Sequence, residues 1–308
     1  MLAYVPIRAE QQTEGQPWGT IALFAANVGV ALVVGCWDPI LGMFRGVGGA
    51  RHLLLPYDRF APWTWITSAF VHSDFVHLAG NMAFLLAFGM VVERFLGWKR
   101  LIGAYLAIAF AAGAVEQLLV WGQHGDSGGA SGCIFGFMTM ALVLAPRSRI
   151  LMGYWVWRHV GTVWVTVKVV ALWFLGLNLM AAFFSGFIIS SSVLHVLGAG
   201  AGLALVLIGM NKGWFDAQGE DWFSLRRAEE ERIADLPDDP DPLRHVIVPK
   251  YSNEDHVRSF AAFMVPATAF LTLGWGLVRV AMMAHEGLPT TLLLLAVGSG
   301  LVYYWRVN

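Results

Sequence analysis

Long apolar stretches, uncharged except for Glu116 in the third, alternate with more polar connections along the first 210 residues of the chain. Six of them run over residues 20–37, 75–92, 101–121, 129–146, 169–189 and 191–210, and two more follow at 259–283 and 288–305. A helix needs roughly 20 apolar residues to cross about 30 Å of hydrocarbon. The pattern therefore predicts an all-α polytopic membrane protein with a core of six helices, a polar insert, and two extra C-terminal transmembrane helices.

The composition is typical of a membrane protein and gives no support for a nucleic-acid partner. Only 13% of the residues are charged and 57% are hydrophobic, whereas a soluble domain carries about 25% charged residues. A large soluble helical protein would need charged helix faces, which these stretches lack. The net charge of −1 gives no sign of a nucleic-acid partner. The two cysteines, Cys36 and Cys133, are too few for a disulfide framework.

The polar insert divides the chain into four predicted parts. These are a cytoplasmic N-terminal segment (1–17), the six-helix core (18–211), an acidic cytoplasmic linker (212–258) and an accessory two-helix membrane segment (259–308). The linker carries 12 of the 21 acidic residues. Within it, residues 224–236 read as an amphipathic helix with Ser224 as its cap. The first apolar stretch has no small-residue cleavage site after it, so we expect it to be retained as a span.

Lysine and arginine predict the orientation. They gather in the connections after the second, fourth and sixth stretches and are absent from the third-to-fourth and fifth-to-sixth connections. The first connection is an exception, with Arg45, Arg51 and Arg59. Because cytoplasmic connections are enriched in these residues, the N-terminus and the insert are expected in the cytoplasm. Ser131 and His195 then lie near the outer ends of their helices.

Ser131 and His195 are the candidate reactive pair. Polar side chains inside a bilayer are costly and usually functional or internally paired, and a serine beside a histidine is the minimum for a base-activated nucleophile. On the sixth helix, His195 shares a face with two glycines, and the fourth helix has a Gly-x-x-x-Gly pair; these glycines are Gly198, Gly202, Gly132 and Gly136. If the two glycine faces pack together, the imidazole can reach the Ser131 hydroxyl.

The second helix offers hydrogen-bond donors. His77 and Asn81 are four residues apart and share one face, so they can hold a developing oxyanion together with the unpaired backbone N–H of Ser131 at a helix start. We expect His72 to point elsewhere, at the water interface. Purely structural roles are the alternatives: His77 and Asn81 would only hydrogen-bond neighbouring helices, Ser131 would only cap its helix, and His195 would only form an interhelical hydrogen bond.

The three histidines do not suggest a metal. His72, His77 and His195 show no recognised ligand spacing. No metal and no cofactor are therefore expected.

Three motifs together resemble the rhomboid intramembrane serine proteases. They are His-x4-His-x3-Asn at His72, His77 and Asn81; Gly-x-Ser-Gly at Gly129, Ser131 and Gly132; and His-x2-Gly-x3-Gly at His195, Gly198 and Gly202. They fall in the family's order on the second, fourth and sixth helices, and Glu93-Arg94 is a further similar feature. The resemblance covers residues 18–211.

The resemblance implies a Ser–His dyad without a carboxylate. Ser131 would be the nucleophile and His195 the general base, with His77, Asn81 and the Ser131 N–H as oxyanion donors. The fifth helix, 169–189, would correspond to the proposed lateral gate. The chain departs from the family in having Phe135 where a tyrosine often stacks on the histidine, and Phe44-Arg45 as the nearest match to a Trp-Arg pair.

We therefore predict an intramembrane serine endopeptidase that cleaves transmembrane protein substrates within a lipid bilayer. The expected location is a bacterial inner membrane, with the active site toward the extracytoplasmic face; no oligomeric state is indicated. A catalytically inactive rhomboid-like protein that binds transmembrane clients is the alternative. A transporter or channel would need charged midplane residues or broken helices in paired repeats, and Glu116, Lys168 and Asn178 form no such pattern.

Overall fold

Apolar helices dominate the computed structural model, which describes residues 2–9, 16–38, 43–45, 51–156, 159–184, 191–217 and 219–234. The main helices are α1 (Trp18–Val34), α3 (Phe75–Leu119), α4 (Ser131–Leu144), α5 (Val167–Phe184), α6 (Ser191–Asn211) and α7 (Trp222–Ala234). The two predicted C-terminal stretches, 259–283 and 288–305, lie outside the described residues.

Helix α3 contains the second and third predicted stretches in one element. Its backbone is non-helical at Gly97, where φ is 73° and ψ is 162°. This left-handed φ favours glycine, so the chain turns there between two helical legs. By length and composition, α3 and residues Ser192–Asn211 of α6 can cross a membrane, and α1, α4 and α5 are shorter apolar helices.

Helix α4 lies at the centre of the bundle. It packs against α3, α5 and α6, and most of its side chains are buried, including the fully buried Phe137, Met138 and Met140. An element that is apolar on every side is expected inside a bundle rather than on its surface. The residue at the start of α4, Ser131, is therefore held on a rigid support.

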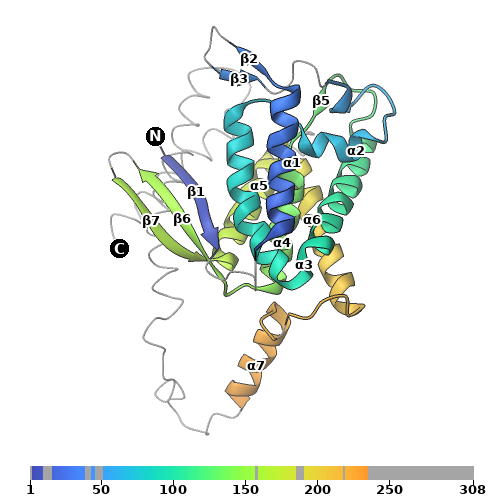
Figure 1. The fold of residues 1–308 in the computed structure, drawn as a ribbon. Coiled ribbons are helices and arrows are strands. Elements are labelled where there is room, and N and C mark those ends of the chain that lie inside the picture. Colours follow the sequence, from blue (N-terminus) through green and yellow to red (C-terminus); the bar gives the residue numbers. More distant parts are fainter. Residues whose placement is uncertain are drawn as a thin grey trace.

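An antiparallel sheet corrects the expectation of an all-α chain. Strands β1 (Leu2–Ala9), β6 (Arg149–Val156) and β7 (His159–Thr166) pair in the order β1-β6-β7 and lie beside the helices (Figure 1). Aromatic and β-branched residues, which favour strands, are frequent in β6 and β7. Part of the segment expected to be a cytoplasmic tail, 1–17, is therefore an edge strand, because β6 offers it a partner.

Short elements and loops gather at the end of the bundle opposite α7 (Figure 1). They are β2 (Cys36–Asp38), β3 (Met43–Arg45), η1 (Arg51–Leu53), β4 (Leu55–Pro56), α2 (Thr64–Thr67), η2 (Ser68–Phe70) and β5 (Asp126–Ser127). Gln117 of α3 holds the connection between α1 and α3 in place through three hydrogen bonds. Its amide nitrogen donates to the carbonyl oxygens of Pro56 and Arg59 at 3.0 and 3.1 Å, and its oxygen accepts from the Trp65 indole at 2.8 Å.

Helix α7, which lies in the polar insert, has a different N-cap from the expected one. Asp221, not Ser224, caps α7: its Oδ1 accepts from the backbone N–H groups of Phe223 and Ser224, both at 3.0 Å. The Ser224 hydroxyl instead donates to Asp221 Oδ2 at 2.6 Å. Aspartate is as good an N-cap as serine, so the cap lies three residues earlier than expected and the helix starts at Trp222. Just before it, Glu220 pairs with Arg94 of α3 through both carboxylate oxygens.

Glu93 joins the first leg of α3 to the start of α1. Its side chain is buried, and its two oxygens accept from the backbone N–H groups of Gly19 and Thr20, each at 2.8 Å. The Thr20 hydroxyl adds a third bond at 2.7 Å. Helix N-termini have unpaired N–H groups and a partial positive charge, so a carboxylate there is stabilising.

Replacing Glu93 with alanine is expected to destabilise the bundle. The Gly19 and Thr20 N–H groups would be left buried and unpaired, which costs about 1–3 kcal/mol for each. Thermal unfolding in detergent should show a clearly lower Tm. The control is Glu230→Ala, which removes an exposed Arg226–Glu230 pair on α7 worth about 0.2–0.5 kcal/mol. Equal Tm values for the two variants would contradict the capping role.

Candidate active site

Glycines bring α4 and α6 into backbone contact. A Cβ atom added at Gly198 would overlap the carbonyl oxygen of Gly132, and one at Gly202 would overlap that of Gly136. At Gly136 an added Cβ would lie 3.0 Å from the Gly198 oxygen. Such close approach is what small residues permit between membrane helices. It sets the start of α6, with His195, beside the start of α4, with Ser131.

The loop before Ser131 lies against His77 and Asn81, the candidate hydrogen-bond donors on α3. Gly129 has a φ of 135°, and an added Cβ there would stand 2.9 Å from His77 Cε1 and 3.7 Å from Asn81 Nδ2. Its backbone N–H donates to the Ser68 carbonyl at 2.8 Å. Both the positive φ and the close approach require glycine. The loop can therefore present Ser131 directly beside His77 and Asn81.

Asp74 caps α3 and fixes the first turn, which carries His77. Its Oδ1 accepts from the backbone N–H of His77, and its Oδ2 accepts from the Ser73 hydroxyl, both at 2.8 Å. These two bonds hold the pKa of Asp74 below its usual value. Ser73 Oγ also lies 3.2 Å from His77 Nδ1. The imidazole is thus restrained at Nδ1, and Nε2 is the nitrogen nearer the added Gly129 Cβ position, at 3.1 Å.

His72 is buried, which corrects the expectation that it points to the water interface. It is 1% exposed, and its ring packs edge-on against His77 with centroids 5.2 Å apart. The Ala130 N–H approaches His72 Nε2 at 3.5 Å. The reason is that η2 and the residues after it pack against the loop before Ser131, where the Gly129 N–H donates to the Ser68 carbonyl. His72 therefore contacts both the His77 ring and the loop before Ser131.

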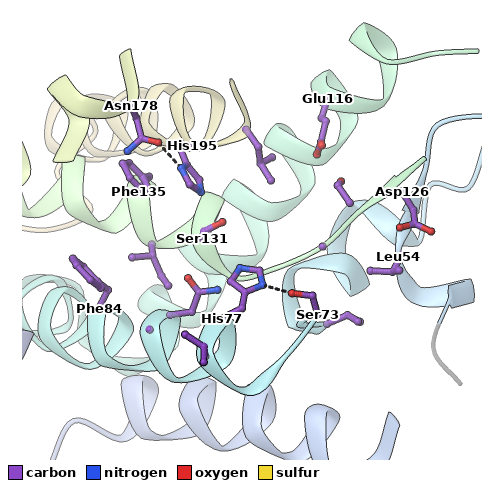
Figure 2. A pocket seen from close by; sticks show the side chains of 18 of the residues that line it. Leu54, Ser73, His77, Phe84, Glu116, Asp126, Ser131, Phe135, Asn178 and His195 are labelled. Atoms are coloured by element: carbon purple, nitrogen blue, oxygen red, sulfur yellow. Dashed lines mark hydrogen bonds between the residues drawn. The ribbon is translucent and has the colours of Figure 1, made fainter. Parts of the chain in front are cut away.

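One cavity of about 730 Å³ contains the candidate groups. Ser131, His195, His77 and Asn81 all line it. Figure 2 shows Ser131 between the rings of His195 and His77, with the side chains turned into the cavity. Asn81 Nδ2 is buried and has no hydrogen-bond partner in the described part of the chain. A buried donor without a partner is costly, and this one belongs to a residue that lines the same cavity as Ser131.

Two contacts fix the His195 ring. Phe135 stacks on its face, with centroids 4.3 Å apart and planes 6° from parallel. Nδ1 lies 2.7 Å from Asn178 Oδ1 on α5, and Figure 2 shows the opposite edge of the ring turned toward Ser131. The loss of a tyrosine hydroxyl at position 135 therefore does not prevent stacking.

A carboxyl group lies at the other end of the cavity. Glu116 of α3 is buried and accepts from the Tyr57 hydroxyl at 3.3 Å. Burial, and then the charge of Glu116, raise the pKa of Tyr57 to about 12. The phenol therefore stays protonated near neutral pH and remains a donor to the carboxyl group.

The structure brings the candidate site residues to this one region. Ser131, His195, His77 and Asn81 line the cavity; Phe135 and the glycines at 129, 132, 136, 198 and 202 position them. The arrangement offers a hydroxyl nucleophile, an imidazole base and side-chain donors for an oxyanion. Sequence reasoning did not assign a role to Asn178. The only indication in the sequence was a single side-chain amide in an otherwise apolar stretch. Its hydrogen-bond partner, His195, could be identified only from the fold.

The fold and the cavity define a class of protein: a bundle of apolar helices that encloses, near one end, a cavity lined by serine, histidine and asparagine side chains. Comparison with known families places the chain within that class. A family model described as the Rhomboid domain matches residues 59–212, which is half of the chain. The chain therefore belongs to the rhomboid family, a family of integral membrane proteins.

Curated relatives cover parts of the same region. The chain is 34% identical over 118 residues to Rhomboid-like protein 11, chloroplastic, of Arabidopsis thaliana, covering 38% of this chain and 39% of that protein. It is 32% identical over 112 residues to Rhomboid protein 1, mitochondrial, of Saccharomyces cerevisiae, covering 35% and 32%. RHOMBOID-like protein 5 of Arabidopsis thaliana is 32% identical over 101 residues, covering 32% of each chain. The chain thus matches about a third of the length of these relatives.

Proposed function

We propose that the protein is an intramembrane serine endopeptidase in which Ser131 is the nucleophile and His195 the general base. The observation that carries the proposal is the single cavity shared by Ser131, His195, His77 and Asn81. A structural serine or histidine would need none of the others nearby. The unpaired Asn81 amide adds to the argument, because a buried donor is normally satisfied unless a ligand completes it.

The reaction follows from the positions of these groups. His195 Nε2 accepts the Ser131 hydroxyl proton while Oγ forms a bond to the substrate carbonyl carbon, and the C=O π electrons move onto the oxygen. When the tetrahedral intermediate collapses, the C–N bond breaks and the leaving amine takes the proton from Nε2. A water molecule then attacks the acyl group, gives its proton to Nε2, and Ser131 recovers it as the acid product leaves.

Three donors are available for the oxyanion. The Asn81 amide and the His77 ring come from α3; the ring donates from Nε2 when that nitrogen carries the proton and the Ser73 hydroxyl turns from Asp74 to Nδ1. The backbone N–H of Ser131, at the first position of α4, has no partner within its helix. The positive end of the α4 dipole favours negative charge at the same place. Donors held in place before the reaction need no reorganisation as charge develops, so these groups would stabilise the transition state more than the substrate.

The substrate class follows from the surroundings of the site. The cavity lies among apolar helices of a membrane protein, and its lining includes Phe84, Met138 and Phe174 beside the reactive groups. We propose that transmembrane segments of other proteins are cleaved here, near the membrane face opposite α7. The relatives found are plant and yeast proteins, so a bacterial inner membrane, with the site facing out of the cytoplasm, remains a sequence-based prediction.

Covalent labelling tests the proposal without a known substrate. An alkyl fluorophosphonate is attacked by an activated serine, with loss of fluoride. We expect the full-length protein in detergent to gain one phosphonyl group on the peptide that contains Ser131. Ser127 is a matched control, because it lines the same cavity; Ser127→Ala should label like wild type, whereas His195→Ala should label far more slowly. An adduct only at other residues, or labelling independent of His195, would contradict the assignment and favour a protein that binds clients without cleaving them.

A further inference from the structure

Asn178 contacts the proposed base from a helix that carries none of the family motifs. It lies on α5, and its side-chain oxygen is 2.7 Å from His195 Nδ1 on α6. Both residues line the cavity that contains Ser131. The contact therefore joins a third helix to the pair formed by α4 and α6.

The second bond of Asn178 determines which way its amide faces. Asn178 Nδ2 donates to the backbone carbonyl of Phe174, one turn earlier on α5, at 2.8 Å. A carbonyl oxygen only accepts, so the amide nitrogen must face Phe174 and the amide oxygen must face His195. The reversed amide would set two acceptors against each other at Phe174.

The tautomer of His195 follows from that orientation. An amide oxygen only accepts, so the Nδ1 atom facing it must carry the ring proton. In a neutral imidazole Nε2 then bears the lone pair. Figure 2 shows Nδ1 toward Asn178 and the other edge of the ring toward Ser131. The Nε2 lone pair is thus available for the serine proton, and Phe135 prevents the ring from tilting away.

We propose that Asn178 is a positioning residue for His195, holding it in the Nδ1–H tautomer with Nε2 directed at Ser131. This rests on the proposed function of Ser131 and His195. Asn178 plays the orienting part that a buried aspartate plays in a Ser–His–Asp triad, but with a neutral amide that needs no charge inside the membrane. During proton transfer the Nδ1–H stays on the imidazole and the amide is never protonated.

Kinetics of three variants test the role. Asn178→Leu keeps the volume and removes the acceptor; we expect kcat to fall roughly 10- to 100-fold with little change in KM, a smaller loss than the ~10⁴-fold seen when a triad aspartate is replaced by asparagine. Asn178→Asp restores an acceptor for Nδ1 but loses the donor to the Phe174 carbonyl, and should recover part of kcat. Leu179→Ala, at the exposed neighbouring position on α5, should behave like wild type. A wild-type kcat in Asn178→Leu, or no recovery in Asn178→Asp, would overturn the proposal.

A spectroscopic readout separates this inference from the proposed activity. In full-length protein labelled with ¹⁵N-histidine, the His195 signals can be assigned by their loss in His195→Ala. We expect wild type to show a protonated Nδ1 and an unprotonated Nε2, and Asn178→Leu to shift toward the other tautomer. Identical His195 spectra in the two proteins would overturn the role of Asn178 whether or not the protein cleaves anything. The expected spectra in a protein without protease activity would retain the role and reject the proposed function.

Discussion

Replacing Gly198 with alanine is expected to separate α4 from α6 and abolish function. A Cβ at this position would overlap the Gly132 carbonyl oxygen, which is backbone and has no rotamer to relieve the clash. Overpacking of a tight core costs about 1–3 kcal/mol, and a displacement of about 1 Å at reacting groups lowers rates about 10²-fold. We expect a lower Tm in detergent and a loss of cleavage of at least that size.

Gly200 is the matched control for this experiment. It lies two residues further along α6, and a Cβ added there would meet nothing within 4 Å. Gly200→Ala should therefore keep wild-type stability and activity, with a small gain because alanine favours helix. If Gly198→Ala behaved like Gly200→Ala, the close α4–α6 contact would not be the feature that aligns Ser131 and His195.

Ser131→Ala and His195→Ala are expected to show the largest losses in kcat, without a matching loss of stability. Each removes one half of a unit that acts together, and in a soluble serine protease removing either residue lowers kcat by about 2 × 10⁶. We expect cleavage to fall by roughly 10⁴-fold or more in each variant, measured as kcat/KM on a fluorogenic transmembrane peptide. The double variant should lose no more than the single ones, because the remaining partner has no function alone. Additive losses would mean that the two residues act separately.

The sequence was sufficient to locate the apolar helices and the polar side chains that line the cavity. Apolar stretches of membrane-spanning length located the bundle, and the glycine spacing on the fourth and sixth stretches indicated which helix faces meet. His77 and Asn81 were found because a four-residue step places them on one face. These features are local, so they can be read along the chain.

The parts that sequence reasoning missed depend on contacts between distant segments. Strand β1 exists because β6 is available to pair with it, and no local pattern reveals that partner. His72 is buried because the segment that follows η2 packs against the loop before Ser131. Asn178 gained a role only when α5 was placed beside α6, 17 residues further along the chain. In each case the residue type was visible in the sequence, but its neighbour was not.

Cleavage by reconstituted protein is the most direct test of the central claim that Ser131 is the nucleophile. Full-length wild type and Ser131→Ala would be placed at equal density in liposomes with one model transmembrane substrate, and products would be identified by mass. The account predicts a defined cut within or next to the transmembrane segment by wild type, and an intact substrate with Ser131→Ala. Equal cleavage by the two proteins would contradict it.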